Sequence, residues 1–258
     1  GTPSAPTLIV NRVGKGKAML LNCAISGYAT TIMGGQGGEM AQAARGDPAL
    51  TTPLRTMIGD ILEGAGVTRK VRITTSDGHD VQPLTMTSRF QHGDTRYVGI
   101  LKPRRSPGAI GPEDYQPVTI DFAKSGHVYD VLDERYLGRI GKIDTTIAGG
   151  VARLFAVLPY KVSMLNVKAQ NSCAAGEPVR MRLRIAAASP RLGTHIVHAD
   201  VLGPDGVPRL HYAQNVRLTR GTGELTIPTA RNDARGPWQV IVRDVASGVT
   251  GSLEFELE

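Results

Sequence analysis

The acidic side chains that could perform chemistry lie mostly beside turns. Acid–base catalysis by paired carboxyl groups needs two acids held about 5–10 Å apart, and none of the 23 acidic residues stands in a pattern that predicts such a pair. The run at residues 76–80, SDGHD, could hold a calcium ion through its oxygens, but it lacks the longer ligand pattern and favours a plain turn. The turn-associated aspartates are Asp77, Asp80, Asp94, Asp205, Asp233 and Asp244.

Two short glycine-containing motifs do not predict a nucleophile or a phosphate site. Ser26-Gly27 is not a nucleophile elbow, because Ala24 occupies the position of the first glycine in G-x-S-x-G. The segment from Gly14 to Lys17 repeats Gly-Lys, but a phosphate loop needs two glycines five apart, followed by Lys and Ser or Thr at a helix start. We interpret this repeat as the turn between two strands.

The histidines are scattered and predict no shared ligand set. His195 and His198 are three residues apart, and on a strand this spacing points them to opposite faces. His127 could form a local hydrogen-bond set with Tyr129 and Asp130, but such a set specifies no reaction. We therefore predict no catalytic residue, no metal site and no bound cofactor.

The charge balance suits polyanions in general but does not predict a nucleic-acid partner. The chain has 30 basic and 23 acidic residues, a net charge of +7 and a pI near 9.6. Its densest basic cluster, Lys102, Arg104 and Arg105, lies in a Pro-rich segment without stacking aromatics, and no nucleic-acid-binding module accompanies it. No stretch approaches 18 consecutive apolar residues, so we also predict no membrane partner.

The two cysteines and the few aromatic residues carry little chemistry. Cys23 and Cys173 have no metal-ligand spacing, and we expect buried free thiols, with a disulfide as the alternative. Aromatic residues make up only 5% of the chain, whereas a sugar-binding platform needs flat rings exposed to solvent. The candidate carbohydrate-contact residues are Tyr97, Tyr115, Tyr136 and Tyr212.

The N-terminal part of the sequence predicts one hairpin and one helix. Two apolar runs flank a Gly-Lys-Gly turn within residues 7–22, which is typical of a β-hairpin. Downstream, Thr51 or Thr52 is expected to cap a helix with Pro53 at its first position, and an apolar face follows until Gly64 or Gly66. One hairpin and one helix bury little surface by themselves.

The rest of the chain predicts two β-sandwiches, so the fold class is mainly β. Short strands with alternating polarity recur about every ten residues between 70 and 159, and Pro159 interrupts the pattern. Seven further strands in residues 160–258 match the count and size of an immunoglobulin-like sandwich. We expect three domains: a hairpin-and-helix segment at 1–69, a β-sandwich at 70–159 and an immunoglobulin-like sandwich at 160–258.

Two strands of the last block show clear alternation. Trp238 shares a face with Val240 and Val242, which predicts a core residue rather than a sugar platform. A strand near residue 180 places Arg180, Arg182 and Arg184 opposite an apolar face. This arginine row is either a binding stripe or, as we expect, a solvated sheet face with opposite-charge neighbours.

Taken in order, these segments resemble the C-terminal part of large bacterial glycoside hydrolases. VNRVGKGKAMLLN, the helix LRTMIGDILEGAGV and the strands FQHGDTRYVGIL and HVYDVLDERYLG resemble β-galactosidases that carry an amidotransferase-like trimerisation domain. GPDG, GELTIP and GPWQVIVRD are similar to immunoglobulin-like or macroglobulin-like domains. In that family the catalytic acids lie on a barrel that is missing here, so the resemblance transfers no catalytic residue.

The resemblance implies a non-catalytic structural or accessory module of a larger carbohydrate-active enzyme. Such a module would position or oligomerise a catalytic domain, and its partners would be the other domains of the parent protein. The alternative is a carbohydrate-binding module that grips a glycan on a sandwich face or loop end. A stand-alone hydrolase is the third hypothesis.

Overall fold

The computed structural model describes residues 8–22, 48–81, 85–103 and 110–258, and it confirms a mainly β fold with several sheets. The chain divides into two compact units, residues 1–70 and residues 71–258. Among the described residues, no helix is long and apolar enough to cross a membrane. Cys23, Ser26 and the basic residues Arg104 and Arg105 lie outside the described residues.

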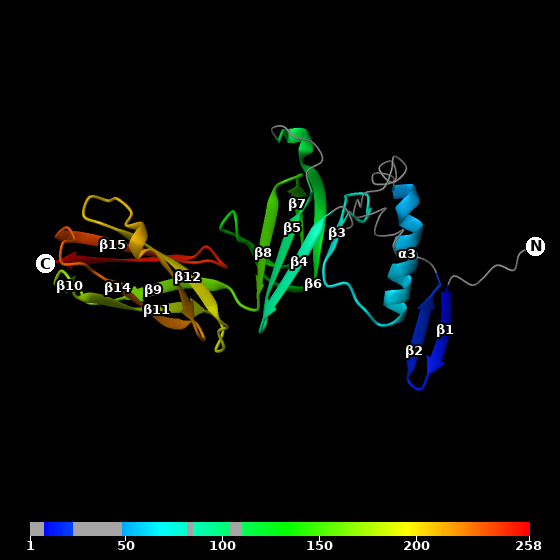
Figure 1. Cartoon of the computed structure of the whole chain (residues 1–258), viewed down its shortest axis with the longest axis horizontal. Coiled ribbons are helices and arrows are strands. Elements are labelled where there is room, and N and C mark those ends of the chain that lie inside the picture. Colours follow the sequence, from blue (N-terminus) through cyan, green and yellow to red (C-terminus); the bar gives the residue numbers. More distant parts are fainter. Residues whose placement is uncertain (1–7, 23–47, 82–84, 104–109) are drawn as a thin grey trace, which may run out of the picture. The chain divides into compact units, whose positions relative to one another are not determined.

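The first unit contains the expected hairpin and helix (Figure 1). Strands β1 (Leu8–Val13) and β2 (Gly16–Leu21) pair antiparallel, and Gly14 supplies the positive φ that their tight turn needs. Helix α3 runs over Pro48–Gly64, so it begins earlier than the expected cap at Thr51 or Thr52. The expected start was wrong because Pro48 already provides a residue that suits the first helical position.

The first unit leaves much of its apolar surface exposed. The two clusters of buried apolar residues in the described structure lie wholly between Val71 and Leu257, and neither includes a residue of the hairpin or of α3. This pattern is typical of a segment that has too few elements to enclose its own core. The exposed large apolar side chains of the first unit are Ile9, Val10, Val13, Leu20, Leu62 and Val67.

Residues 71–159, here called the first β block, form one sheet rather than two. Its strand order is β3-β6-β8-β5-β4, and β7 pairs with β6. A separate hydrophobic core of the first β block lies on one face of this sheet, around Phe122 and Phe155, whose rings meet edge to face. The strands are β3 (Arg72–Thr74), β4 (Met86–His92), β5 (Thr95–Leu101), β6 (Gln116–Asp130), β7 (Arg135–Ile147) and β8 (Ala152–Leu158), with a short 3₁₀ turn, η2 (Pro112–Asp114), before β6.

Long strands β6 and β7 replace the series of short strands that the sequence predicted. Between two of their paired positions β6 advances from Asp121 to Gly126, while β7 moves by only two residues. Ala123 adopts a positive φ in this bulge, and Arg96 donates to the carbonyl oxygens of Phe122 and Lys124. A bulge lets a strand bend while it keeps its pairing, which explains the fusion of segments that look separate in sequence.

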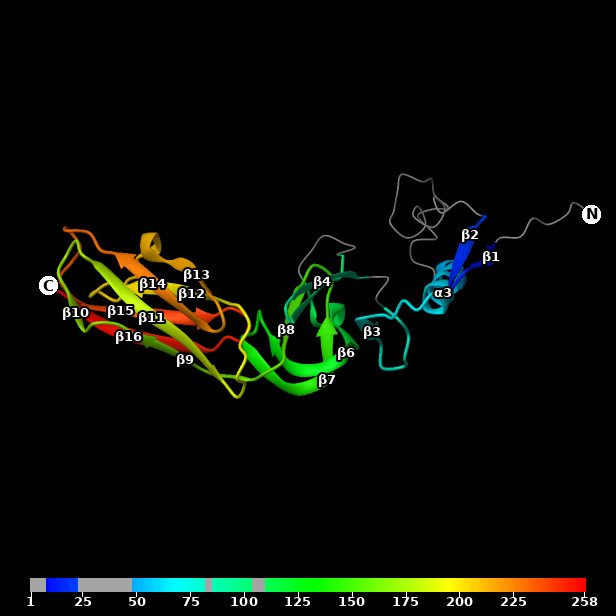
Figure 2. The same ribbon diagram turned by 90° about the horizontal axis from the view of Figure 1, so that it is seen from below.

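Residues 160–258, here called the second β block, form two sheets with a core between them (Figure 2). One sheet has the order β10-β16-β15-β12-β13, and the other has the order β14-β11-β9. All seven strands predicted in this block are present, and β10 is an additional short strand. The elements are β9 (Val162–Lys168), β10 (Ser172–Cys173), β11 (Pro178–Ala187), β12 (His195–Leu202), η3 (Leu210–Tyr212), β13 (Gln214–Leu218), β14 (Thr222–Pro228), β15 (Gly236–Asp244) and β16 (Thr250–Leu257).

The core of the second β block extends into the first. Tyr129 and Leu158 of the first block belong to the same buried cluster as Trp238, and residues 71–258 form one compact unit. The chain nevertheless passes from one sheet to another at this point. Strand β8 ends at Leu158 in the first sheet, and β9 begins at Val162 in a different sheet, where the sequence predicted a boundary. Whether residues 160–258 fold alone, and whether they form an immunoglobulin-like domain, stay predictions.

Trp238 is a core residue, as predicted. Its side chain is 1% exposed and lies in the same cluster as Val240, Val242 and Phe255. The indole N–H donates to the carbonyl oxygen of Ala234 at 2.8 Å, so its one polar group is satisfied. The ring therefore contributes apolar burial without an orphaned donor.

We expect Trp238→Ala to lower the free energy of unfolding by about 3–5 kcal/mol, since truncating a buried aromatic leaves a cavity. Denaturant titration of the full chain would measure this loss. The matched control is Leu210→Ala, whose side chain is 79% exposed and which should change stability by less than about 0.5 kcal/mol. A loss below about 1 kcal/mol for Trp238→Ala would contradict the core assignment.

Candidate functional site

The densest set of polar side chains lies buried between the two β blocks. Strand β12 points His195 inward in line with Val197, and β15 points Asp244 inward in line with Val242. Val197 and Asp244 are register partners, so the histidine and the aspartate lie on one face of the five-stranded sheet. Alternation along the two strands therefore carries both polar residues into the core.

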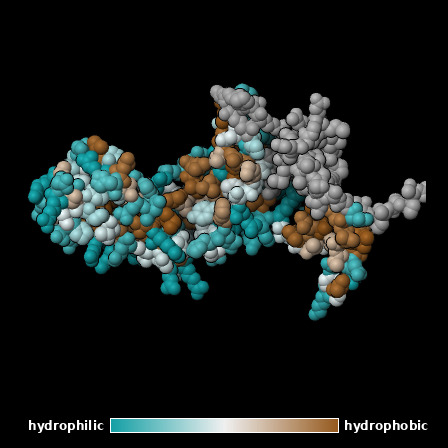
Figure 3. Space-filling view, in the orientation of Figure 1, coloured by the Kyte–Doolittle hydropathy of each residue, from teal (hydrophilic) through white to brown (hydrophobic). Residues whose placement is uncertain are grey.

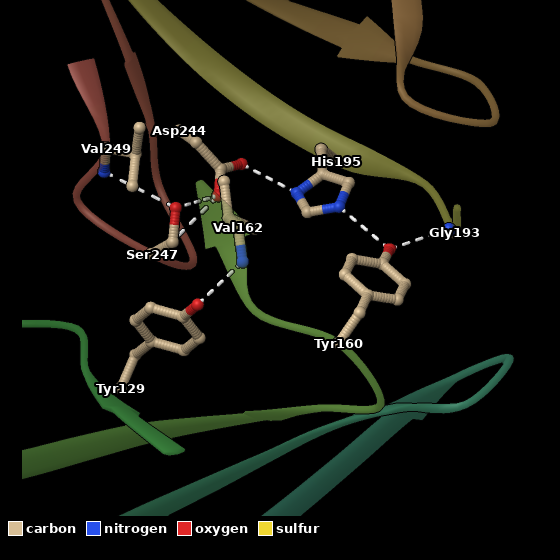
Figure 4. A network of polar contacts seen from close by, with 8 residues as sticks. All are labelled: Tyr129, Tyr160, Val162, Gly193, His195, Asp244, Ser247 and Val249. Carbon is tan, nitrogen blue, oxygen red and sulfur yellow. Dashed lines mark hydrogen bonds and ion pairs between the residues drawn. The ribbon is translucent and has the colours of Figure 1, made fainter. Parts of the chain in front are cut away.

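Asp244 has a carboxylate with three hydrogen-bond donors (Figure 4). One oxygen contacts Nδ1 of His195 at 2.8 Å, and the other accepts from the backbone N–H and the hydroxyl of Ser247. The Ser247 oxygen in turn accepts from the N–H of Val249 at 3.3 Å. Asp244, His195 and Ser247 are each at least 96% buried, so these contacts replace the water that would otherwise bind their polar groups.

His195 continues the network to Tyr160, in the segment that joins the blocks. Nδ1 of His195 faces the Asp244 carboxylate, and Nε2 forms a hydrogen bond with the Tyr160 hydroxyl 2.9 Å away. That hydroxyl also accepts from the N–H of Gly193 at 2.7 Å. Burial raises the pKa of Tyr160, with the Gly193 N–H opposing the rise, so the hydroxyl keeps its proton.

Tyr129 supplies a second link from the first β block. Its ring lies on β6, and its hydroxyl accepts from the N–H of Val162, the first residue of β9, at 2.8 Å. Burial is the main reason that the pKa of Tyr129 rises to about 12, against the opposing contribution of the Val162 N–H. We call the side chains of Tyr129, Tyr160, His195, Asp244 and Ser247 the junction network.

Tyr129 stands in a row of cross-strand neighbours in the first β block, here called the aromatic row. Successive register partners across β4, β5, β8, β6 and β7 are Phe90, Tyr97, Ala156, Tyr129 and Tyr136. The middle of this row is buried in the shared core, whereas Phe90 at one end is 64% exposed. Figure 3 shows patches of hydrophobic surface on the first β block.

The turn between β6 and β7 adds a third contact to the second block. Glu134 in this turn forms an ion pair with Arg243 of β15. A Cβ atom on Gly248 would lie 2.8–3.0 Å from atoms of Glu134, so glycine permits this close approach, and its φ of 72° also suits glycine. The junction is therefore fixed by apolar packing, buried hydrogen bonds and one surface ion pair.

The residue types of the junction network resemble those of a hydrolytic triad, but their order differs. In a Ser-His-Asp triad the histidine lies between the other two and takes the serine proton. Here Ser247 donates to Asp244 instead, and His195 contacts Tyr160 on its other side. Each member is buried and bonds another member or a backbone N–H, which is typical of structural polar groups.

The four predicted carbohydrate-contact tyrosines occupy different environments. Tyr115 is exposed, Tyr97 and Tyr136 are half-buried in the aromatic row, and Tyr212 is buried. Tyr212 donates its hydroxyl proton to Asp233 and packs edge to face on Trp238. Tyr97 and Tyr136 are separated across the sheet by the buried Ala156 and Tyr129.

The remaining sequence candidates are placed apart from the junction network. His127 bonds Tyr136 at 2.8 Å rather than the expected Tyr129 or Asp130, because Tyr136 lies beside it on β7. Asp130 instead pairs with Arg153 at 2.6 Å. Among the described residues no group of three or more potential ligands could hold a metal.

Other expected features can be located individually. The run at residues 76–80 is an exposed turn closed by Thr75 and His79, with Gly78 at positive φ. His195 and His198 point to opposite faces of β12, as predicted. Cys173 is a free thiol, but it is half-buried rather than buried because it lies in the short edge strand β10.

No sequence motif indicates that Asp244 and Tyr160 belong to a buried polar network. Asp244 was grouped with the turn aspartates, because the strand that contains it ends there. The available signal was alternation, since Trp238, Val240, Val242 and Asp244 occupy every second position. A polar residue on the inward face of a strand indicates a buried partner, and His195 has the same position on β12.

No protein-family model and no curated protein matches the chain. Similar solved structures include a superoxide reductase from Ignicoccus hospitalis (TM-score 0.28, 12% identity, 38% of this chain and 82% of that one). A β-glucosidase from Listeria innocua has a TM-score of 0.28 and 15% identity over 38% of this chain and 16% of its own. A β-glycosidase from Bacteroides vulgatus has a TM-score of 0.28 and 12% identity over 67% of this chain and 25% of its own. The chain thus has distant structural similarity to parts of glycoside hydrolases, at TM-scores too low to support an argument about function.

Asp244→Ala should lower the free energy of unfolding by about 3–5 kcal/mol, because it leaves His195 and two Ser247 donors without their buried acceptor. Chemical denaturation would measure the loss. Asp200→Ala is a matched control on the neighbouring strand, since the Asp200 side chain is 48% exposed, and should cost less than about 1 kcal/mol. Equal losses for the two substitutions would show that the junction network does not contribute more to the free energy of unfolding than an exposed carboxylate does.

Alkaline pH should destabilise the protein through Tyr129. Its pKa is about 12 in the folded protein and about 10 in the unfolded chain, so its contribution is complete below pH 10 and is lost as pH rises toward 12. Melting temperature against pH, with tyrosinate absorbance, would follow this loss. Tyr129→Phe should weaken the alkaline dependence, and the exposed Tyr115→Phe should not; an unchanged profile in Tyr129→Phe would contradict the assignment.

Proposed function

We propose that this chain is a non-catalytic module of a larger carbohydrate-active enzyme, in which residues 71–258 act as one rigid spacer. Its task is to hold a catalytic domain, which this chain lacks, in a fixed position relative to the other domains or subunits. The sequence resemblance to the C-terminal regions of β-galactosidases provides the enzyme class. The junction between the two β blocks provides the physical reason for a positioning role.

The observation that carries the proposal is the burial of the junction network. Its serine, histidine, aspartate and tyrosines are the types that a hydrolase would expose to substrate, yet at least 96% of the surface of each residue is hidden from solvent. Their hydrogen bonds instead connect β12, β15 and the segment between the blocks. Such a network supports a role in orienting the two β blocks rather than in catalysis, since a substrate has no access to its polar atoms.

Rigidity follows from the chemistry of the links. Bending the junction would expose Tyr129 and Leu158 to water and would separate the Val162 N–H from its acceptor. Each buried hydrogen-bonding group that loses its partner costs about 1–3 kcal/mol, in addition to the apolar surface exposed. The bent arrangement is therefore sparsely populated, and the module transmits a fixed geometry.

We expect the purified chain to lack glycosidase activity. A panel of aryl glycosides with different sugars would test this, with release of the aryl alcohol as the measurement. The reading frame that contains this chain should also encode a catalytic barrel. Turnover that a single Asp or Glu substitution abolishes, while the variant remains folded, would overturn the proposal, as would a reading frame without any catalytic domain.

A further inference from the structure

Strand β11 presents a row of arginines on the outer face of the three-stranded sheet. Its inward residues are buried, whereas Arg180, Arg182 and Arg184 are all exposed. Side chains two residues apart on a strand are about 7 Å apart along it. The central position of β11 between β14 and β9 places this row along the middle of the face (Figure 2).

The neighbours of the row offset only part of its positive charge. Arg182 has the exposed Glu224 opposite it on β14 but the exposed Lys168 opposite it on β9. The side chains of these four cations (the three arginines and Lys168) and of Glu224 form no ion pair or hydrogen bond within the described part of the chain. Glu224 is thus one opposite-charge neighbour of the expected kind, while Lys168 adds a further positive charge to the face.

The face carries an excess of positive charge, because one exposed acid, Glu224, stands against four exposed cations. Like charges directly opposite each other on a sheet repel, as do Arg182 and Lys168 here. Guanidinium groups bind carboxylate, sulfate or phosphate through two parallel hydrogen bonds, and they keep their charge at any physiological pH. Three such groups at regular spacing match a ligand that repeats its negative charge along one direction.

We propose that the outer face of β9, β11 and β14 binds a linear acidic polysaccharide. The residues that flank the row, Asn166, Thr222 and Thr226, could hydrogen-bond sugar hydroxyls. The face carries no aromatic side chain among its described residues, so nothing on it could stack a nucleobase, which is the usual anchor for single strands. This site is separate from the junction network, and the proposal does not depend on the proposed function.

The test measures binding of the full chain to heparin as a sulfated probe and to alginate as a carboxylated probe. Isothermal titration at several salt concentrations would give the affinity and its salt dependence. The test variant R180Q/R182Q/R184Q should weaken binding to at least one probe by about tenfold or more, because three charge-assisted contacts are lost. All three side chains are exposed, so the melting temperature should stay near that of the unmodified chain.

The matched control removes the same charge from other exposed sites of the second β block. R191Q/R217Q/R235Q lowers the net charge by three and leaves the β11 row intact. If the face is specific, this control binds the probe within about twofold of the unmodified chain, since long-range attraction is largely screened at 0.15 M salt. Neutral dextran should not bind in either case.

Three results would overturn the proposal. Equal weakening in the test and control variants would mean that net charge alone attracts the probes. Equal or tighter binding of single-stranded DNA, lost in the same test variant, would assign the face to nucleic acid. Failure of the unmodified chain to bind either acidic polysaccharide would remove the site. The glycosidase assay is indifferent to all three results.

Discussion

The junction depends on the burial of one carboxylate. Asp244 is fully enclosed, and a polar group in that position is tolerated because His195 and Ser247 supply its hydrogen bonds. The Ser247 hydroxyl accepts from the N–H of Val249, and the His195 ring also bonds the hydroxyl of Tyr160. Tyr160 in turn fixes Gly193, so that the loop before β12 and the segment between the blocks adopt one arrangement.

The rest of residues 71–258 is organised around this constraint. The bulge in β6 bends the first sheet. One face of this sheet packs on the core of the first block, and Tyr129 on the other face packs into the core of the second block. The turn at Glu134 then reaches Gly248, close to Ser247 in sequence. Apolar packing contributes most of the adhesion in such an interface, while the polar groups select a single register, because any other register leaves them unsatisfied.

Local patterns predicted much of the fold, and long-range pairing explains what they did not predict. Alternation located all seven expected strands of the second block and placed Trp238 in the core, since the period of two is a property of each strand. The joined strands β6 and β7 were predicted as shorter pieces, because a bulge with Ala123 at positive φ reads as a break in sequence. The start of α3 was placed too late for a similar reason: several residues near Pro48 and Pro53 suit a helix start equally well.

The candidate site was harder to predict than the fold. His195, Tyr160 and Asp244 come from three distant segments, and their convergence depends on the order in which strands pair. Sequence alone also could not show which charges lie beside the arginine row, because Lys168 and Glu224 become its neighbours only through the register of the sheet. Residue types were visible in the sequence, whereas their partners were properties of topology.

Native-state hydrogen exchange at two backbone amides would test the rigid junction most directly. The Val162 N–H bonds the Tyr129 hydroxyl, and the Gly193 N–H bonds the Tyr160 hydroxyl. If the two blocks form one rigid body, both amides exchange with the same opening free energy as core amides such as those of Val98 and Val240. Exchange at Val162 and Gly193 through local opening, orders of magnitude faster than at those core amides, would show that the blocks move independently and would contradict the account.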